Sequence, residues 1–201
     1  MYKGVKSVRK NDGRKITRDK ENPIDNILID FATLVNPYLH SVGVTPNMLT
    51  FGSFAFGLIT VAFIYNNMFE VAVLCYLIGY TFDCMDGNMA RMFNEITDFG
   101  DKFDHYTDTV QIILLIVFVL INSTISKRAK IVFLVVFIVF SPLAAIHIGC
   151  QERAYNNKTN DFLSVFNQFC TNKESIYYTR YFGIGTLNIA IASVLLAARF
   201  I

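Results

Sequence analysis

Four aspartates interrupt an otherwise apolar part of the chain. Asp83 and Asp86 are three residues apart and Asp104 and Asp108 are four apart, so on helices each pair shares one face. Two adjacent antiparallel helices would bring all four carboxylates together. A charged side chain inside a membrane segment costs roughly 2.5 to 3.5 kcal/mol even on insertion scales. Four such acids at these spacings therefore predict a bound cation.

The donor set indicates which cation. Carboxylates without a nearby Cys pair or paired His favour a hard ion such as Mg²⁺ or Mn²⁺ over zinc. Four acids could hold two ions about 4 Å apart, which stabilises both the attacking and the leaving oxygen of a displacement. Because Mg²⁺ usually joins a few carboxylates to substrate phosphates, this ligand set suggests a phosphate-bearing substrate. Asp98 and Asp101 are interpreted instead as solvated acids at a helix start.

The residues between the acids support a phosphate site. Gly87 directly follows Asp86, and Ala90 lies about one turn later, so a ligand can approach the backbone there. Arg91 then adds a planar positive fork that suits phosphate. Gly100 is interpreted as a contact between helices, because small residues let membrane helices pack closely.

Five apolar runs predict the helices that carry these side chains. They cover residues 47–66, 71–82, 109–126, 131–146 and 181–198. A helix needs about 20 residues to cross the hydrocarbon, and the first and last runs approach that length. The second and third reach it only if the adjoining acidic segments are helical, which predicts helices over 70–92 and 100–122 joined by a loop over 93–99. The expected fold is an all-α, polytopic transmembrane helix bundle with five clear spans and six possible.

Composition agrees with a membrane protein. Hydrophobic residues make up 53% of the chain, and charged residues only 17% against about 25% in soluble proteins. Residues 151–180 are too polar to span and are interpreted as a loop with interfacial helical pieces. The four cysteines have no CxxC spacing and suggest neither a zinc site nor a disulfide framework.

An amphipathic helix is expected before the first span, from Pro23 to near Pro37. Its apolar stripe has helical spacing and consists of Ile24, Ile27, Leu28, Phe31, Leu34 and Val35, with Ile29 off the stripe. A core helix of a soluble domain would show the same pattern. The spans that follow favour an N-terminal helix that lies in the membrane interface.

A basic arm, residues 1–22, precedes the membrane-embedded domain at 23–201. Eight of the eighteen Lys and Arg lie in the first twenty residues, and no apolar h-region makes the arm a secretory signal. We expect it to be disordered or bound to an anionic membrane surface, and to hold that end in the cytoplasm. Lys127, Arg128 and Lys130, beyond the third span, conflict with that orientation. Nucleic acid is not an expected partner, because the arm has no interleaved aromatic residues beyond Tyr2 and no recognition motif follows.

The acidic segment resembles a known family. The pattern Asp83-x2-Asp86-Gly87-x2-Ala90-Arg91-x8-Gly100-x3-Asp104-x3-Asp108 matches the signature of the CDP-alcohol phosphotransferases without departure. The resemblance implies a membrane enzyme in which the hydroxyl of an acceptor alcohol attacks the β-phosphorus of a CDP-linked alcohol and CMP is released. The family also suggests six spans and a homodimer. Separately, a cytoplasmic basic arm would place the carboxylate-rich helix ends, and so the active site, on the cytoplasmic side.

The resemblance also implies roles for particular residues. Asp83, Asp86, Asp104 and Asp108 would ligate two Mg²⁺ or Mn²⁺ ions, and Asp108 would also be the catalytic base. The residues implied to bind the cytidine and its diphosphate are Pro46, Asn47, Gly87, Ala90, Arg91 and Thr97. A carboxylate beside bound metal is well placed to deprotonate a hydroxyl, which agrees with these roles.

The donor stays open between two groups of the family. Phe103-Asp104-His105 resembles the choline and ethanolamine phosphotransferases, which combine a CDP-amino-alcohol with diacylglycerol. The short chain and Thr97-Asp98-Phe99-Gly100 look more like enzymes that use CDP-diacylglycerol, which we favour. His105 could assist catalysis or pack beside the metal site.

Two other classes of function are compatible with buried acids. A cation transporter would line its ion path with carboxylates, but it has no evident use for Gly87, Ala90 and Arg91 at fixed offsets. A noncatalytic membrane scaffold would show neither activity nor cation dependence.

Overall fold

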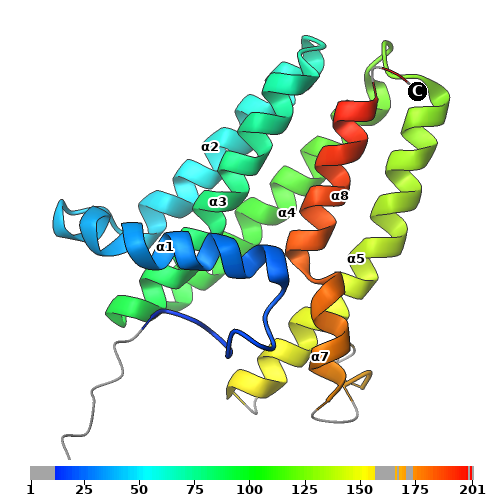
Figure 1. Ribbon diagram of the computed structural model, residues 1–201. Coiled ribbons are helices and arrows are strands. Elements are labelled where there is room, and N and C mark those ends of the chain that lie inside the picture. Colours follow the sequence, from blue (N-terminus) through cyan, green and yellow to red (C-terminus); the bar gives the residue numbers. More distant parts are fainter. Residues whose placement is uncertain (1–11, 157–165, 167, 171–173, 199, 201) are drawn as a thin grey trace, which may run out of the picture.

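The fold is a helix bundle, seen here in a computed structural model that describes residues 12–156, 166, 168–170, 174–198 and 200 (Figure 1). The described helices are α1 (Pro23–Ser41), α2 (Pro46–Tyr65), α3 (Phe69–Phe93), α4 (Asp98–Ile121), α5 (Lys127–Asn156), α7 (Ser175–Thr179), the 3₁₀ helix η1 (Arg180–Phe182) and α8 (Ile184–Ala197). Four helical stretches are long and apolar enough to cross a membrane, namely α2, α4, α5 and the combined run Ser175–Ala197. The predicted all-α polytopic bundle is confirmed.

α3 has the length of a span but carries Asp83 and Asp86 in its second half. It runs beside α2 along most of its length (Figure 1). The close approach depends on Gly79, where an added Cβ would lie 3.3 Å from the carbonyl oxygen of Ser53 and 3.2 Å from Cβ of Phe56 on α2. α4 packs against α2, and α8 packs against both α3 and α5. α3 is not among the four apolar helices, so the fifth span expected there stays a prediction.

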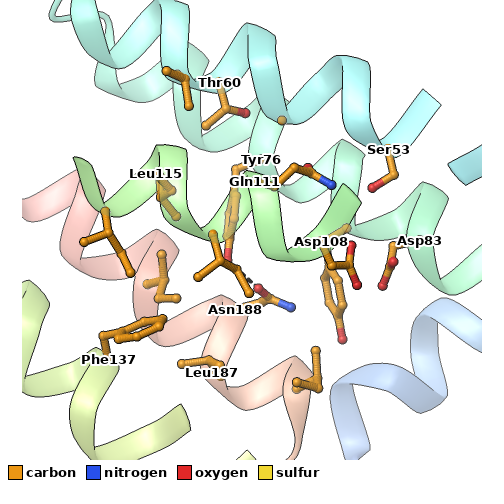
Figure 2. A pocket seen from close by; sticks show the side chains of 17 residues that line it. Ser53, Thr60, Tyr76, Asp83, Asp108, Gln111, Leu115, Phe137, Leu187 and Asn188 are labelled. Carbon is orange, nitrogen blue, oxygen red and sulfur yellow. Dashed lines mark hydrogen bonds between the residues drawn. The ribbon is translucent and has the colours of Figure 1, made fainter. Parts of the chain in front are cut away.

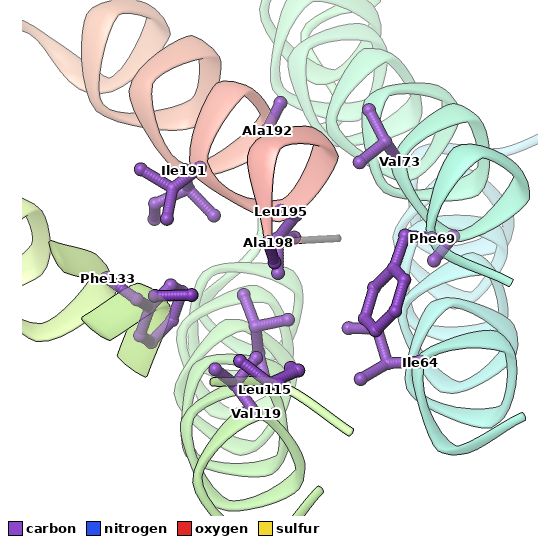
Figure 3. Close-up of a cluster of buried hydrophobic side chains, with 14 of the residues drawn as sticks. Ile64, Phe69, Val73, Leu115, Val119, Phe133, Ile191, Ala192, Leu195 and Ala198 are labelled. Carbon is purple, nitrogen blue, oxygen red and sulfur yellow. The ribbon is translucent and has the colours of Figure 1, made fainter. Parts of the chain in front are cut away.

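A buried apolar core lies at the end of the bundle opposite the acids. Ile64 ends α2, Phe69 begins α3, and Val119 lies near the end of α4 (Figure 3). The same cluster includes Phe133 from the first half of α5 and Leu195 from the end of α8. This end supplies the main apolar packing of five helices, while a smaller apolar cluster joins α1, α2 and α3 nearer the acids.

The helices that bear the acids begin and end close to their predicted positions. The side chains of Thr45 and Thr97 cap α2 and α4, accepting hydrogen bonds from the backbone N–H groups of Met48 and Gly100. Asn94, in the left-handed conformation with φ 57°, ends α3. The loop between α3 and α4 is therefore residues 94–97, shorter than the predicted 93–99.

The apolar stripe of α1 faces away from the protein. Ile27, Phe31 and Leu34 are 67%, 48% and 79% exposed, whereas Asp25 and Asn36 on the other face are buried. This arrangement is the reverse of a soluble core helix, so it supports the interfacial interpretation.

The predicted end of α1 near Pro37 is wrong, because the helix continues to Ser41. Proline removes one backbone hydrogen bond, but it does not stop a helix that is held by packing on both sides of it. Asn36, just before the proline, is fully buried and donates to the backbone oxygen of Met85 and to Oδ1 of Asn88, both on α3, at 2.9 Å.

The second half of the basic arm is packed against the helices rather than solvated. We call residues 12–21 the N-terminal strap. Arg14 donates to Asn26 and Asp30 on α1, and Lys15 forms an ion pair with Glu152 on α5. These partners are acids and amides on other helices, which the arm's own composition does not reveal. Residues 1–11 lie outside the described part of the chain.

One expectation is corrected near the end of α5, and the helical pieces expected after residue 150 are present. Cys150 and Cys170 form a disulfide, although their spacing did not predict one. α5 also extends through the first part of the polar stretch 151–180, and Ser175–Thr179 forms α7. Residues 157–165, 167 and 171–173 of that stretch lie outside the described part of the chain.

We predict that Gly79→Val destabilises the bundle by about 1 to 3 kcal/mol, because the larger side chain overpacks the contact between α2 and α3. Thermal unfolding in detergent would measure the change. Leu74→Val introduces the same β-branched residue at an exposed site of the same helix and is the matched control. Equal melting temperatures for the two variants would contradict the proposed close packing.

Candidate active site

Three carboxylates converge between α3 and α4. Asp83, Asp104 and Asp108 each present an oxygen within 4.8 Å of the others. Oδ1 of Asp104 is buried and has no hydrogen-bond partner among the described residues. An unsatisfied buried carboxylate oxygen within an all-oxygen donor set fits a hard divalent cation. The residues therefore suit the metal ions that the sequence predicts.

Asp86 lies one helical turn from Asp83 but outside this group of three. It is 5% exposed, and the Thr50 hydroxyl donates to its Oδ2 at 2.6 Å. Sequence reasoning missed Thr50, although its position one turn after Pro46 on α2 was a usable signal. Asp86 and Asp104 line the same two cavities, so Asp86 contributes its carboxylate to the same site.

A cavity of about 320 Å³ lies where the ends of α2, α3 and α4 meet, and we call it the helix-end cavity. It is lined by all six residues implied to bind substrate, which are Pro46, Asn47, Gly87, Ala90, Arg91 and Thr97, together with Asp86 and Asp104. The starts of α2 and α4 approach each other closely here, since a Cβ on Gly100 would lie 3.0 Å from Oδ1 of Asn47. Gly100 thus packs the start of α4 against the start of α2.

The guanidinium of Arg91 lies beside Gly87, one helical turn earlier on α3. A Cβ added to Gly87 would lie 3.1 Å from Nη1 of Arg91, so the missing side chain makes room for the guanidinium. Nε of Arg91 donates to the carbonyl oxygen of Gly13 at 2.7 Å. The strap therefore fixes the orientation of this arginine.

A second cavity of about 210 Å³, the middle cavity, is lined by all four motif aspartates. Its opposite wall is polar and comes from the start of α1 and from α5. Nε2 of Gln151 donates to Oε1 of Glu21 at 2.7 Å, and the Tyr80 hydroxyl donates to Asp25. Burial raises the pKa of Asp25 to about 6, against the opposing effect of the Tyr80 hydrogen bond.

A third cavity of about 140 Å³ lies deeper among α2, α3, α4, α5 and α8, and we call it the apolar chamber. Figure 2 shows Asp83 and Asp108 side by side at one end of it, with Leu115 and Phe137 toward the other. Within the chamber the Tyr76 hydroxyl donates to Oδ1 of Asn188. Asp83 and Asp108 line both the middle cavity and the apolar chamber.

Several acidic and basic residues near the motif remain outside its centre. Asp98 and Asp101 are exposed in the first turn of α4 at the edge of the helix-end cavity, while Thr97 caps the helix. His105 is exposed, and its Nδ1 is 2.8 Å from the carbonyl oxygen of Asp101. It does not pack among the carboxylates.

Comparison with known families gives a match over most of the chain. The family model for CDP-alcohol phosphatidyltransferase matches residues 43–198, which include α2 to α8 and every motif residue described above. No curated protein and no solved structure matches the chain significantly. Because the match covers most of the chain, this protein belongs to the CDP-alcohol phosphatidyltransferase family.

Proposed function

We propose that the protein transfers a substituted phosphate group from a CDP-alcohol, with CDP-diacylglycerol favoured, to the hydroxyl of an acceptor alcohol. Such a transferase serves phospholipid synthesis, and the proposal includes a site for two Mg²⁺ or Mn²⁺ ions held by Asp83, Asp86, Asp104 and Asp108. The observation that carries it is the helix-end cavity, where all six residues implied to bind substrate surround two of these acids. Family membership argues against the transporter and scaffold alternatives.

The three cavities suggest how the two substrates are divided. The helix-end cavity is polar and contains Arg91 and Asn47, which suits the cytidine diphosphate. Asp108 borders the middle cavity and the apolar chamber. An acceptor hydroxyl within reach of Asp108 would therefore enter from the side opposite the nucleotide.

The proposed reaction is a displacement at phosphorus. The acceptor oxygen forms a bond to the β-phosphorus of the donor, the bond from that phosphorus to the CMP oxygen breaks, and Asp108 takes the hydroxyl proton. Bound divalent ions would offset the negative charge of the diphosphate and of the departing CMP. Arg91, held by Gly13 and packed over Gly87, adds a fixed positive charge on the donor side.

One observation favours the second donor class. The apolar chamber reaches Asp108, and an apolar space beside the proposed base suits a lipid acceptor such as diacylglycerol. A CDP-choline or CDP-ethanolamine donor would then occupy the helix-end cavity. The two donor classes thus differ in which substrate carries the acyl chains.

We also propose that the active site faces the cytoplasm and that the protein is a homodimer, both from the sequence and the family resemblance. The strap bonds to Asn88 and Arg91, so the described part of the basic arm lies at the active-site end of the bundle. The Cys150–Cys170 disulfide lies at the same end and is more typical of an oxidising compartment. The test introduces a cysteine at exposed Asp12 and uses sealed vesicles of known orientation. Labelling of that cysteine by a membrane-impermeant reagent shows which side of the membrane the active site faces.

We predict that the purified protein releases CMP from a CDP-linked donor only when a divalent ion is present. Chelation should abolish release, and Mg²⁺ or Mn²⁺ should restore it, because the carboxylates alone repel the diphosphate. The measurement is radiolabelled CMP release from CDP-diacylglycerol, CDP-choline and CDP-ethanolamine across a panel of acceptors. The donor that reacts identifies the class, and the absence of release from every pair would contradict the proposed enzyme.

We predict that Asp108→Asn lowers turnover by at least about 100-fold, because general base catalysis contributes about 10² to 10⁴. CDP-donor binding should change little, because the asparagine amide keeps an oxygen that can still contact a bound ion. Initial rates and equilibrium binding of the donor would separate the two effects. Lys102→Gln removes an exposed charge from the same helix, at a residue that lines none of the three cavities, and should keep nearly the wild-type rate. A wild-type rate in Asp108→Asn would eliminate this residue as the base.

A further inference from the structure

The N-terminal strap, residues 12–21, reaches the active site although it lies outside the segment that the family model matches. That match begins at residue 43. Nonetheless, the carbonyl oxygen of Asp12 accepts from Nδ2 of Asn88 at 2.8 Å, and that of Gly13 accepts from Nε of Arg91 at 2.7 Å. The strap therefore adds to the walls of the site, together with the family motif on α3 and α4 and the residues of α1 and α5 described above.

The strap is held firmly at several points. Nη1 of Arg14 donates to Oδ1 of Asn26 at 2.7 Å, and Ile16 is buried against the Cys150–Cys170 disulfide. Gly13 has φ +68°, and a Cβ there would lie only 2.4 Å from the backbone oxygen of Asn88. Only glycine permits this approach to α3. The contacts of Gly13, before Lys15, and of Ile16, after it, therefore fix the backbone position of Lys15.

Lys15 lies where two of the cavities meet. The residues that line both the helix-end cavity and the middle cavity are Lys15, Asp86, Gly87, Arg91 and Asp104. Lys15 and Arg91 are thus the two cations of this junction among the described residues. The side chain of Lys15 is 24% exposed, and its Nζ forms an ion pair with Glu152, which also lines the helix-end cavity.

The junction is where a transferred phosphate has to lie. If the nucleotide occupies the helix-end cavity and the acceptor approaches through the middle cavity, the reacting phosphorus sits between them. A diphosphate placed there meets the carboxylates of Asp86 and Asp104 and needs positive charge to offset them. The ammonium group of Lys15 has three hydrogen-bond donors on a flexible side chain, so it can exchange Glu152 for a phosphate oxygen.

We propose that Lys15 is a donor-binding residue that contacts the diphosphate opposite Arg91, exchanging its ion pair with Glu152 for a phosphate oxygen. The proposal rests on the proposed function and extends it to a segment beyond the family match. Under the simpler alternative, the Lys15–Glu152 pair only pins the strap to α5. The two accounts differ in whether a phosphate-bearing ligand is affected more than its phosphate-free counterpart.

The test compares ligand binding by the full-length protein purified in detergent with Mg²⁺ present. Affinities for CDP and for cytidine are measured by calorimetry for wild type, Lys15→Met, Lys15→Arg and Lys20→Met. Lys20 lies in the same strap but lines none of the three cavities described here, so its variant is the matched control for net charge. Cytidine lacks the phosphates, so it reports damage to the site as a whole.

We expect Lys15→Met to weaken CDP binding about 10-fold or more, the usual effect of losing a hydrogen bond to a charged group, with cytidine affinity unchanged. Lys15→Arg should retain most of the CDP affinity, and Lys20→Met should match wild type. Equal losses for CDP and cytidine, or an equal loss in Lys20→Met, would overturn the proposal in favour of a structural or general charge effect.

The outcomes also separate this proposal from the function on which it rests. Wild-type protein that binds CDP and releases CMP, together with full CDP affinity in Lys15→Met, would overturn the role of Lys15 alone. Wild-type protein that neither binds CDP nor releases CMP would overturn both.

Discussion

The burial of like charges inside a membrane bundle is the constraint on which the rest of this structure depends. Asp83, Asp104 and Asp108 present oxygens within 4.8 Å of one another, and Asp86 is almost fully buried beside them. Carboxylates this close repel each other strongly in a medium of low dielectric constant. The arrangement is therefore stable as a receptor for positive charge, and the bundle has to be held together by interactions elsewhere.

The distribution of apolar packing meets that requirement. The main buried cluster joins α2, α3, α4, α5 and α8 at the end away from the acids (Figure 3). At the acidic end, a smaller apolar cluster that includes Leu49 and Met85 is accompanied by specific polar contacts, such as Thr50 with Asp86. The main apolar packing thus lies away from the acids, and the apolar chamber extends from the acids to that packing.

The acidic motif was predictable because its information is local. Helical spacing of three and four residues places each pair of aspartates on one face, and the adjacent apolar runs define the helices that carry them. Asp98 and Asp101 were also interpreted correctly as exposed acids of a first turn. For these elements the nearest neighbours in sequence decide the structure.

The strap and the disulfide were not predictable from such local patterns. Arg14, Lys15 and Ile16 read as part of a solvated basic arm until their partners on α1 and α5 are known. Cys150 and Cys170 are twenty residues apart and carry no spacing signal. The prediction that α1 ends near Pro37 was wrong for a related reason. Packing of the neighbouring residues outweighs the local preference of proline to end a helix.

The charges that line the three cavities come both from the local motif and from residues that are distant in the sequence. The family motif supplies acids on helices α3 and α4, but a phosphate cannot approach acids alone. Positive charge at the junction comes from Arg91, within the motif, and from Lys15, which distant contacts bring there. Beyond the junction the middle cavity is walled by Glu21 and Asp25, so its far side disfavours further negative charge. A CDP-linked donor bound as proposed would therefore place its diphosphate at the junction, between the two cations and the buried acids beyond them.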